Sequence, residues 1–199
     1  MNEFVTDFLA SIIEQAAKME ANLIKPYRKD VVELFTADAF FQMSMLNLKN
    51  WGKIMRHFIE GKPEEMFTAQ MTEWNAQGGI FESASALTTR RCYAMKRIAF
   101  LIFSCEDDEF IGQLDMLMKK MIDVIKKREG KGDTKQRIFV FFLTRVMLIR
   151  LNTQTLTEAL RKLWPHLLNE LISVFETRSD AEQQQQQALD QESSKLTIE

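Results

Sequence analysis

Apolar residues recur every three or four positions along most of the chain, which is the pattern of amphipathic helices. Phe4, Phe8, Ile12, Ala16, Met19 and Leu23 form the first such stripe. Pro26 predicts that this helix ends near Ile24, because proline disfavours helical geometry in the residue before it. The same pattern predicts further helices over about 27–43, 48–59, 63–75 and 82–105, from the acidic run 106–109 to about 128, over 134–151, and over 153–178 with a bend or restart at Trp164-Pro165.

The segment RIFVFFLTRVMLIRL, residues 137–151, is almost wholly apolar but contains Arg145 and ends near Arg150. It is too short and too charged to span a bilayer, which needs about 20 apolar residues. We therefore expect a buried core helix. A buried charge needs a partner, so Arg145 and Arg150 are predicted to pair with acidic side chains or backbone carbonyls, with a lipid or partner pocket as the alternative for Arg145.

Successive amphipathic helices with short connections predict an all-α protein. The expected architecture is an irregular α-solenoid (HEAT/armadillo-like) or a helical bundle of about eight helices, and no sequence repeat of 20–50 residues decides between them. Residues 1–178 would form one helical domain. The glutamine-rich tail, 179–199, is expected to be disordered because it has too few apolar residues to bury.

The last predicted helix carries a wide apolar face that suggests self-association. Four leucine and valine positions at steps of three and four are the candidates for a homodimer contact: Leu163, Leu167, Leu171 and Val174. The alternative is that these side chains belong to the intramolecular core.

Candidate catalytic chemistry is sparse. His57 and His166 are the only histidines, and no CxxC, HExxH, GxSxG or phosphate-binding glycine loop is present. The acidic run 106–109 is better explained as the start of a helix than as a metal site. Cys92 and Cys105 are expected to be reduced core thiols in a cytosolic protein, since no secretory signal is visible at the N-terminus. We expect no enzymatic activity, no cofactor and no metal.

Charge is distributed unevenly. The net charge is -2, but residues 1–24 carry -3 and the tail -4, so residues 25–178 carry about +5. This excess suits an anionic membrane and is too small for a nucleic-acid binder. The candidate lipid-binding residues cluster at one helix junction: Lys126, Lys127, Arg128, Lys131, Lys135 and Arg137. The rival surface consists of Arg90, Arg91, Lys96 and Arg97, and the alternative for the main cluster is solvated cations that complement a helix C-terminus.

Four segments in order resemble the C-terminal region of the Dopey family. They are KPYRKDVVELFTADAFFQM (25–43) followed by Trp51, KRIAFLIFS (96–104), FVFFLTRVMLIRL (139–151) and LWPHLLNEL (163–171). The resemblance covers about residues 4–175, while the glutamine-rich tail has no counterpart. Dopey proteins are much larger, so this chain looks like a C-terminal piece of one.

The resemblance implies a cytoplasmic protein that is peripheral on Golgi and endosomal membranes. It also implies partners: an Arf-exchange-factor-related scaffold, kinesin light chain in kinesin-driven transport, lipid flippases and phosphatidylinositol 4-phosphate. We therefore expect a non-enzymatic membrane-trafficking adaptor module that binds an anionic phosphoinositide. The alternative is a protein-interaction or homodimerisation domain without direct lipid binding.

Overall fold

The computed structural model of this chain describes residues 3–59, 63–80, 82–126 and 131–173, and this part is all-helical. The elements are α1 (Glu3–Met19), η1 (Ala21–Leu23), η2 (Lys25–Tyr27), α2 (Arg28–Thr36), η3 (Phe40–Gln42), α3 (Met45–Ile59), α4 (Pro63–Asn75), α5 (Ala84–Ser104), η4 (Ile111–Gln113), α6 (Leu114–Lys126), α7 (Lys131–Arg150) and a further helix over 153–173. The predicted all-α class is confirmed.

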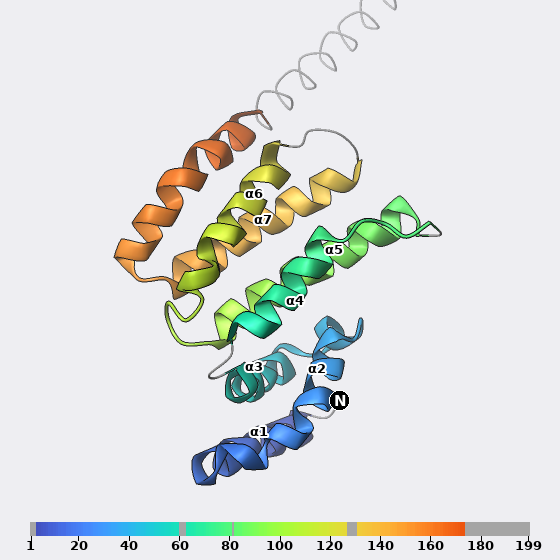
Figure 1. Cartoon of the computed structure of the whole chain (residues 1–199), viewed down its shortest axis with the longest axis vertical. Helices are drawn as coiled ribbons and strands as arrows, with labels where there is room; N and C mark the ends of the chain where they lie inside the picture. The colour runs from blue at the N-terminus through green and yellow to red at the C-terminus, as the bar shows by residue number, and fades with distance from the viewer. Residues whose placement is uncertain (1–2, 60–62, 81, 127–130, 174–199) are drawn as a thin grey trace, which may run out of the picture.

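The helices stack in layers from α1 to helix 153–173 (Figure 1). Two helix pairs, α4 with α5 and α6 with α7, lie next to one another because α5 packs against α7. On its other side α5 packs against α3, which in turn packs against α1. Helices α3, α5 and α7 therefore form one row. Stacking of helix pairs that contact mainly their neighbours is the arrangement of an α-solenoid.

Helix α5 is the central element, and its sequence explains why. Ser83 caps its N-terminus by accepting a hydrogen bond from the backbone N–H of Ala86 at 3.1 Å. Its second half is apolar nearly all round, and Ala94, Met95, Ile98 and Leu101 are fully buried. A helix with so little polar surface packs against other helices over most of its circumference.

Aromatic side chains fix the junction between α3 and α5. The ring of Phe40 lies edge-on to Phe35, Trp51 and Phe100, with centroids 5.2, 5.7 and 5.3 Å away. Edge-to-face contacts of this kind are directional, so the cluster sets the angle between the two helices as well as burying area.

Two predicted details of the first helix differ from the structure. Helix α1 ends at Met19, and two 3-10 turns replace its expected last turn. Phe4, Phe8 and Ile12 point outward, while the side that faces α3 is formed by the small residues Thr6 and Ala10. Thr6 donates to the side chain of Asn47 in this contact, so the interface is partly polar and the helices approach closely.

Three predicted features of the second half of the chain also differ from the structure. The acidic run 106–109 forms a turn before α6 and does not open the helix. Helix α7 begins at Lys131, earlier than the predicted start at residue 134. Residues 153–173 form a continuous helix through Pro165, without the predicted restart.

Candidate functional site

The two arginines of the apolar segment have different environments. Arg150 donates to the backbone carbonyl of Cys105 and lies 3.1 Å from the Asp107 carboxylate, so its predicted pairing is confirmed. Arg145 is exposed and makes no hydrogen bond or ion pair with the described residues. The prediction of a buried, paired Arg145 is therefore wrong. Ile138, Phe142 and Ile149 share its side of α7 and are also exposed.

A turn of unusual backbone geometry holds Arg150 in place. Asp108 has a φ of 62° and donates its backbone N–H to the carbonyl of Arg150. Its carboxylate accepts hydrogen bonds from the backbone and the side chain of Asn152. The acidic run thus joins the end of α5 to the end of α7, which is a structural role.

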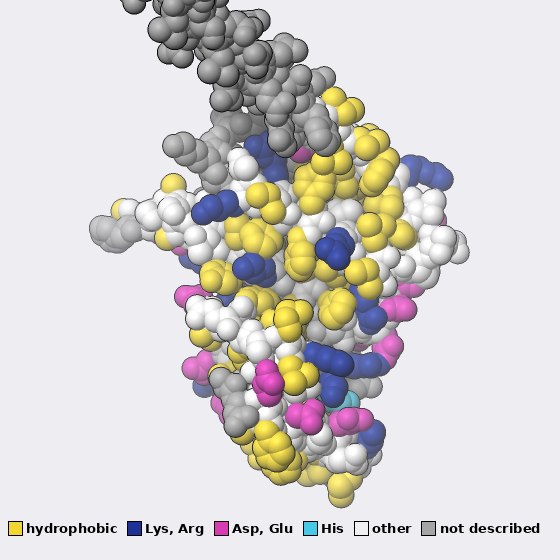
Figure 2. Space-filling view, turned by 180° about the vertical axis from the view of Figure 1, so that it is seen from behind, with side chains coloured by type: hydrophobic (Ala, Val, Ile, Leu, Met, Phe, Trp, Pro, Cys, Tyr) yellow, Lys and Arg dark blue, Asp and Glu magenta, His cyan; other side chains and the backbone are white. Residues whose placement is uncertain are grey.

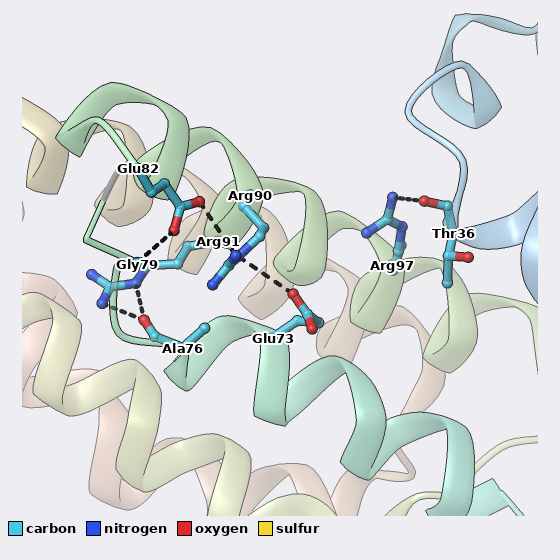
Figure 3. A network of polar contacts seen from close by, with 8 residues as sticks. All are labelled: Thr36, Glu73, Ala76, Gly79, Glu82, Arg90, Arg91 and Arg97. Carbon is cyan, nitrogen blue, oxygen red and sulfur yellow. Dashed lines mark hydrogen bonds and ion pairs between the residues drawn. The ribbon is translucent and has the colours of Figure 1, made fainter.

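Three of the four rival cations are held by contacts within the fold (Figure 3). Arg90 lies 3.4 Å from Glu73 and 3.3 Å from Glu82, and Arg91 donates to the carbonyl of Ala76 at 2.7 Å. Arg97 is buried and donates to the carbonyl of Thr36 at 2.5 Å. Burial lowers the pKa of the Arg97 guanidinium. These side chains tie α5 to its neighbours, so they offer little to a ligand.

Lys96, the fourth rival cation, has a different setting. Its ammonium group lies 5.2 Å from the ring centroid of Tyr93, 5.4 Å from that of Phe139 and 5.8 Å from that of Phe41. This position brings together η3, α5 and α7. Cation–π contacts at these distances stabilise the ammonium group without neutralising it.

The main basic cluster is only partly described. Lys127 and Arg128 lie outside the described residues, and of Lys131 the structure gives only its place at the start of α7. Lys126 ends α6 and Lys135 lies in the second turn of α7; both are exposed and form no hydrogen bond or ion pair among the described residues. Arg137 pairs with buried Glu170 at 2.5 Å, so it serves the fold.

The residues of the predicted dimer contact also differ in their environments. Leu163 and Leu167 are buried in the core, so their proposed role in a dimer contact is wrong. Leu171 is 40% exposed, and Val174 lies outside the described residues. Self-association through the outer side of helix 153–173 stays a prediction.

A groove that sequence reasoning missed runs along the row of α3, α5 and α7. Its volume is about 1220 Å³. Helix α5 forms the floor with Ala99, Phe100 and Phe103, and α3 and α7 form the two walls. Gly52 of α3 belongs to this lining, and a Cβ there would come within 3.2 Å of the Ser104 hydroxyl. The glycine therefore allows α3 and α5 to approach closely beside the groove.

The lining of the groove combines apolar surface with positive charge. Phe142 and Ile149 on α7 and Met45 on α3 expose large apolar side chains. Among the charged residues of the lining, five are basic and one is acidic: Lys49, Lys53, Arg56, Lys96 and Arg145 against Glu14. Figure 2 shows apolar and basic side chains intermingled on this side of the molecule.

Some lining cations have partners within the chain and others do not. Arg56 pairs with Glu106, and Lys53 lies 3.9 Å from Asp7. Lys49 and Arg145 have no hydrogen-bond or ion-pair partner among the described residues. The apolar spacing of α7 contained a signal for this site, since residues 138, 142, 145 and 149 fall on one helix face.

The described residues show no candidate metal centre. No group of three histidine, cysteine, aspartate or glutamate side chains could hold a metal ion there, and Cys92 and Cys105 are buried free thiols. Burial, together with nearby Glu109, raises the pKa of Cys105 to about 12. None of the described helices is long and apolar enough to cross a membrane.

Comparison with known proteins gives a consistent result. A family model described as DOP1 C-terminal matches residues 2–198. Mouse protein DOP1B is 30% identical over 151 residues, which is 76% of this chain and 6% of that protein. The DOP1 homologue of Drosophila melanogaster is 28% identical over 172 residues, 82% of this chain and 6% of its own length. Protein pad-1 of Caenorhabditis briggsae is 26% identical over 191 residues, 94% of this chain and 8% of its own length.

The chain thus spans less than a tenth of the length of each of these three relatives. No solved structure matches the chain.

Proposed function

We propose that this chain, which belongs to the Dopey (DOP1) family and matches its C-terminal region, is a non-enzymatic module of a membrane-trafficking adaptor. In this proposal it contacts membranes that carry an anionic phosphoinositide, phosphatidylinositol 4-phosphate, through basic residues at the junction of α6 and α7. The protein would act at Golgi and endosomal membranes from the cytoplasmic side.

The exposure of Lys126 and Lys135 at this junction supports the proposal most directly. The electrostatic alternative, in which these cations complement a helix C-terminus, fits Lys126 at the end of α6. It does not fit Lys135, which lies in the second turn of α7, near the positive end of that helix. A positive charge gains nothing from that position, so an external anion is the better explanation.

An apolar side chain beside the cations supports membrane contact further. Ile138, one turn after Lys135, is 61% exposed. Exposed apolar residues next to basic ones can enter the headgroup region while the cations contact phosphates. Each basic side chain contributes about 1 kcal/mol near an anionic membrane.

Vesicle flotation tests the proposal. The wild-type chain should float with vesicles that contain phosphatidylinositol 4-phosphate and much less with neutral vesicles. The double variant Lys126→Glu and Lys135→Glu should bind at least about 30-fold more weakly, since it loses about 2 kcal/mol of attraction. Raising the salt concentration should weaken wild-type binding because screening shortens the range of the attraction.

A matched control carries the same charge change elsewhere. Lys29 and Arg161 are exposed and lie outside the junction, so Lys29→Glu with Arg161→Glu should leave flotation close to wild type. Equal losses in both double variants would mean that only net charge matters. Equal flotation with vesicles that contain the phosphoinositide and with neutral vesicles would favour the alternative, a protein-interaction domain without direct lipid binding.

The remaining partners suggested by the family likeness are part of the proposal as well. An Arf-exchange-factor-related scaffold and kinesin light chain would bind the whole protein, and we assign them to regions beyond this chain. The chain spans so little of its relatives that these contacts need not involve it.

A further inference from the structure

We infer that the groove formed by α3, α5 and α7 is the docking site for an acidic amphipathic helix of a partner protein. The inference concerns a different surface from the proposed membrane contact at the α6–α7 junction. It depends on the shape of the groove, the composition of its walls and the sign of its charge.

Three rows of side chains, one on each helix, define the shape. The lining positions follow helical spacing on each element: 45, 48, 49, 52, 53, 56 and 57 on α3, 96, 99, 100, 103 and 104 on α5, and 139, 142, 145, 146 and 149 on α7. Each helix thus presents one continuous face to the groove over about three turns. A long trough with helical walls suits a rod-shaped ligand.

The size favours a helix over a small molecule. The volume of about 1220 Å³ exceeds the range of about 300–1000 Å³ of typical small-molecule pockets. Helix-in-groove recognition places one apolar face of the ligand helix on the floor and leaves its other face in solvent. An open groove fits that arrangement. A single lipid fits it poorly, because its acyl chain would stay partly in water.

The floor and walls can supply the apolar contacts. Phe103 is 55% exposed, Ile149 57% and Met45 82%, so each loses considerable water contact when a ligand covers it. These residues come from all three helices. Burial of such side chains contributes roughly 25 cal/mol per Å² of apolar surface.

The sign of the charge selects an acidic partner. The whole chain has a net charge of -2, yet the groove lining contains five basic residues and one acidic residue. Lys49 on one wall and Arg145 on the opposite wall are exposed and unpaired among the described residues, so they could receive carboxylates on both flanks of a bound helix. Charge complementarity also disfavours a basic helix.

Selection from a displayed library of random 16-residue peptides tests the inference. The wild-type chain is the target, and the double variant Phe142→Asp with Arg145→Glu is used for counter-selection. We expect enriched peptides with apolar residues at i, i+4 and i+7 or i+8 and with glutamate or aspartate beside them. A fluorescein-labelled winner should bind the variant at least ten-fold more weakly in a polarisation assay.

The matched control is Leu148→Asp. Leu148 is an exposed apolar residue of α7 at 48%, and it does not line the groove. This variant should bind the winning peptide like wild type. All variants replace exposed residues, so unchanged circular dichroism and melting are expected and serve as the check on folding.

Four outcomes would overturn the inference. They are enrichment of basic or unpatterned peptides, no enrichment, equal binding to the Phe142→Asp and Arg145→Glu variant, and equal loss in Leu148→Asp. Two parallel measurements identify other occupants. Concentration-dependent doubling of mass in light scattering that Phe142→Asp removes would assign the groove to a second copy, and loss of vesicle flotation in the groove variants would assign it to membrane.

The two proposals can fail independently. Lys126→Glu with Lys135→Glu should leave peptide binding unchanged, while the groove variants should leave flotation unchanged.

Discussion

Arg137 and Arg145 lie on the same helix but should contribute very differently to stability. Arg137 pairs with Glu170 at 2.5 Å, and the side chain of Glu170 is only 6% exposed. This contact fastens helix 153–173 to α7. Arg145 is exposed and unpaired among the described residues. We therefore expect Arg137→Met to destabilise the chain strongly and Arg145→Met to change little.

The magnitude follows from the burial of the pair. Removing one partner of a buried ion pair costs about 3–5 kcal/mol, because the other charge is left without compensation. Arg137 retains 21% exposure, so water can partly solvate Glu170 after the change, and we expect about 3 kcal/mol. For Arg145→Met we expect less than about 0.5 kcal/mol, as for other exposed positions.

Urea unfolding, followed by far-ultraviolet circular dichroism, measures both changes. At a slope of about 2 kcal/mol per molar urea, Arg137→Met should lower the midpoint by about 1.5 M and Arg145→Met by less than about 0.3 M. The double variant Arg137→Met with Glu170→Met replaces both charges by apolar groups. It should be more stable than either single variant, because no unpaired charge remains.

Two results would refute this reasoning. One is a loss for Arg137→Met no larger than that for Arg145→Met. The other is a double variant whose loss equals the sum of the two single losses, since additivity would mean that the two side chains do not interact.

Two further predictions concern the end of α5 and the turn after it. Cys105 should resist iodoacetamide at pH 8 in the folded chain and react with it in urea. The free energy of unfolding should also fall as pH rises from about 9 towards about 12, because only the thiol of the unfolded chain ionises in that window. A free energy of unfolding that does not change over this range would contradict the prediction. Asp108→Ala should lower the free energy of unfolding, measured in urea, by about 2–3 kcal/mol. Asp108→Gly should lower it by about 1 kcal/mol less, since glycine tolerates the φ of 62°. Equal losses in the two variants would exclude backbone strain at this position.

Local signals in the sequence predicted several elements well. The helix predicted over 63–75 agrees with α4, whose observed range is Pro63–Asn75. The helical pattern over 82–105 also predicted the position of α5, which the structure gives as Ala84–Ser104. Such features depend on neighbouring residues, so a single sequence contains the information.

Side-chain environments were harder to predict because they depend on distant elements. A helix face that lines a groove is as apolar as one that enters the core, so the pattern around Arg145 suggested burial. Arg137 looked like a member of a basic cluster because Glu170, its partner, is 33 residues away. The outward position of the large apolar residues of α1 was mispredicted for the same reason. Helix α3 packs against the side of α1 that has the small residues Thr6 and Ala10, and no local signal in the sequence indicates which side it contacts.

The row of α3, α5 and α7 has a mechanical consequence. The two walls of the groove belong to different layers of the stack, and α5 is their common neighbour. Any rotation of the α3 layer against the α7 layer must therefore widen or narrow the groove. In an array whose layers contact mainly their neighbours, small rotations add along the stack. Tension applied to the ends of the chain would thus change the width of the groove and with it the contacts of a helix bound there.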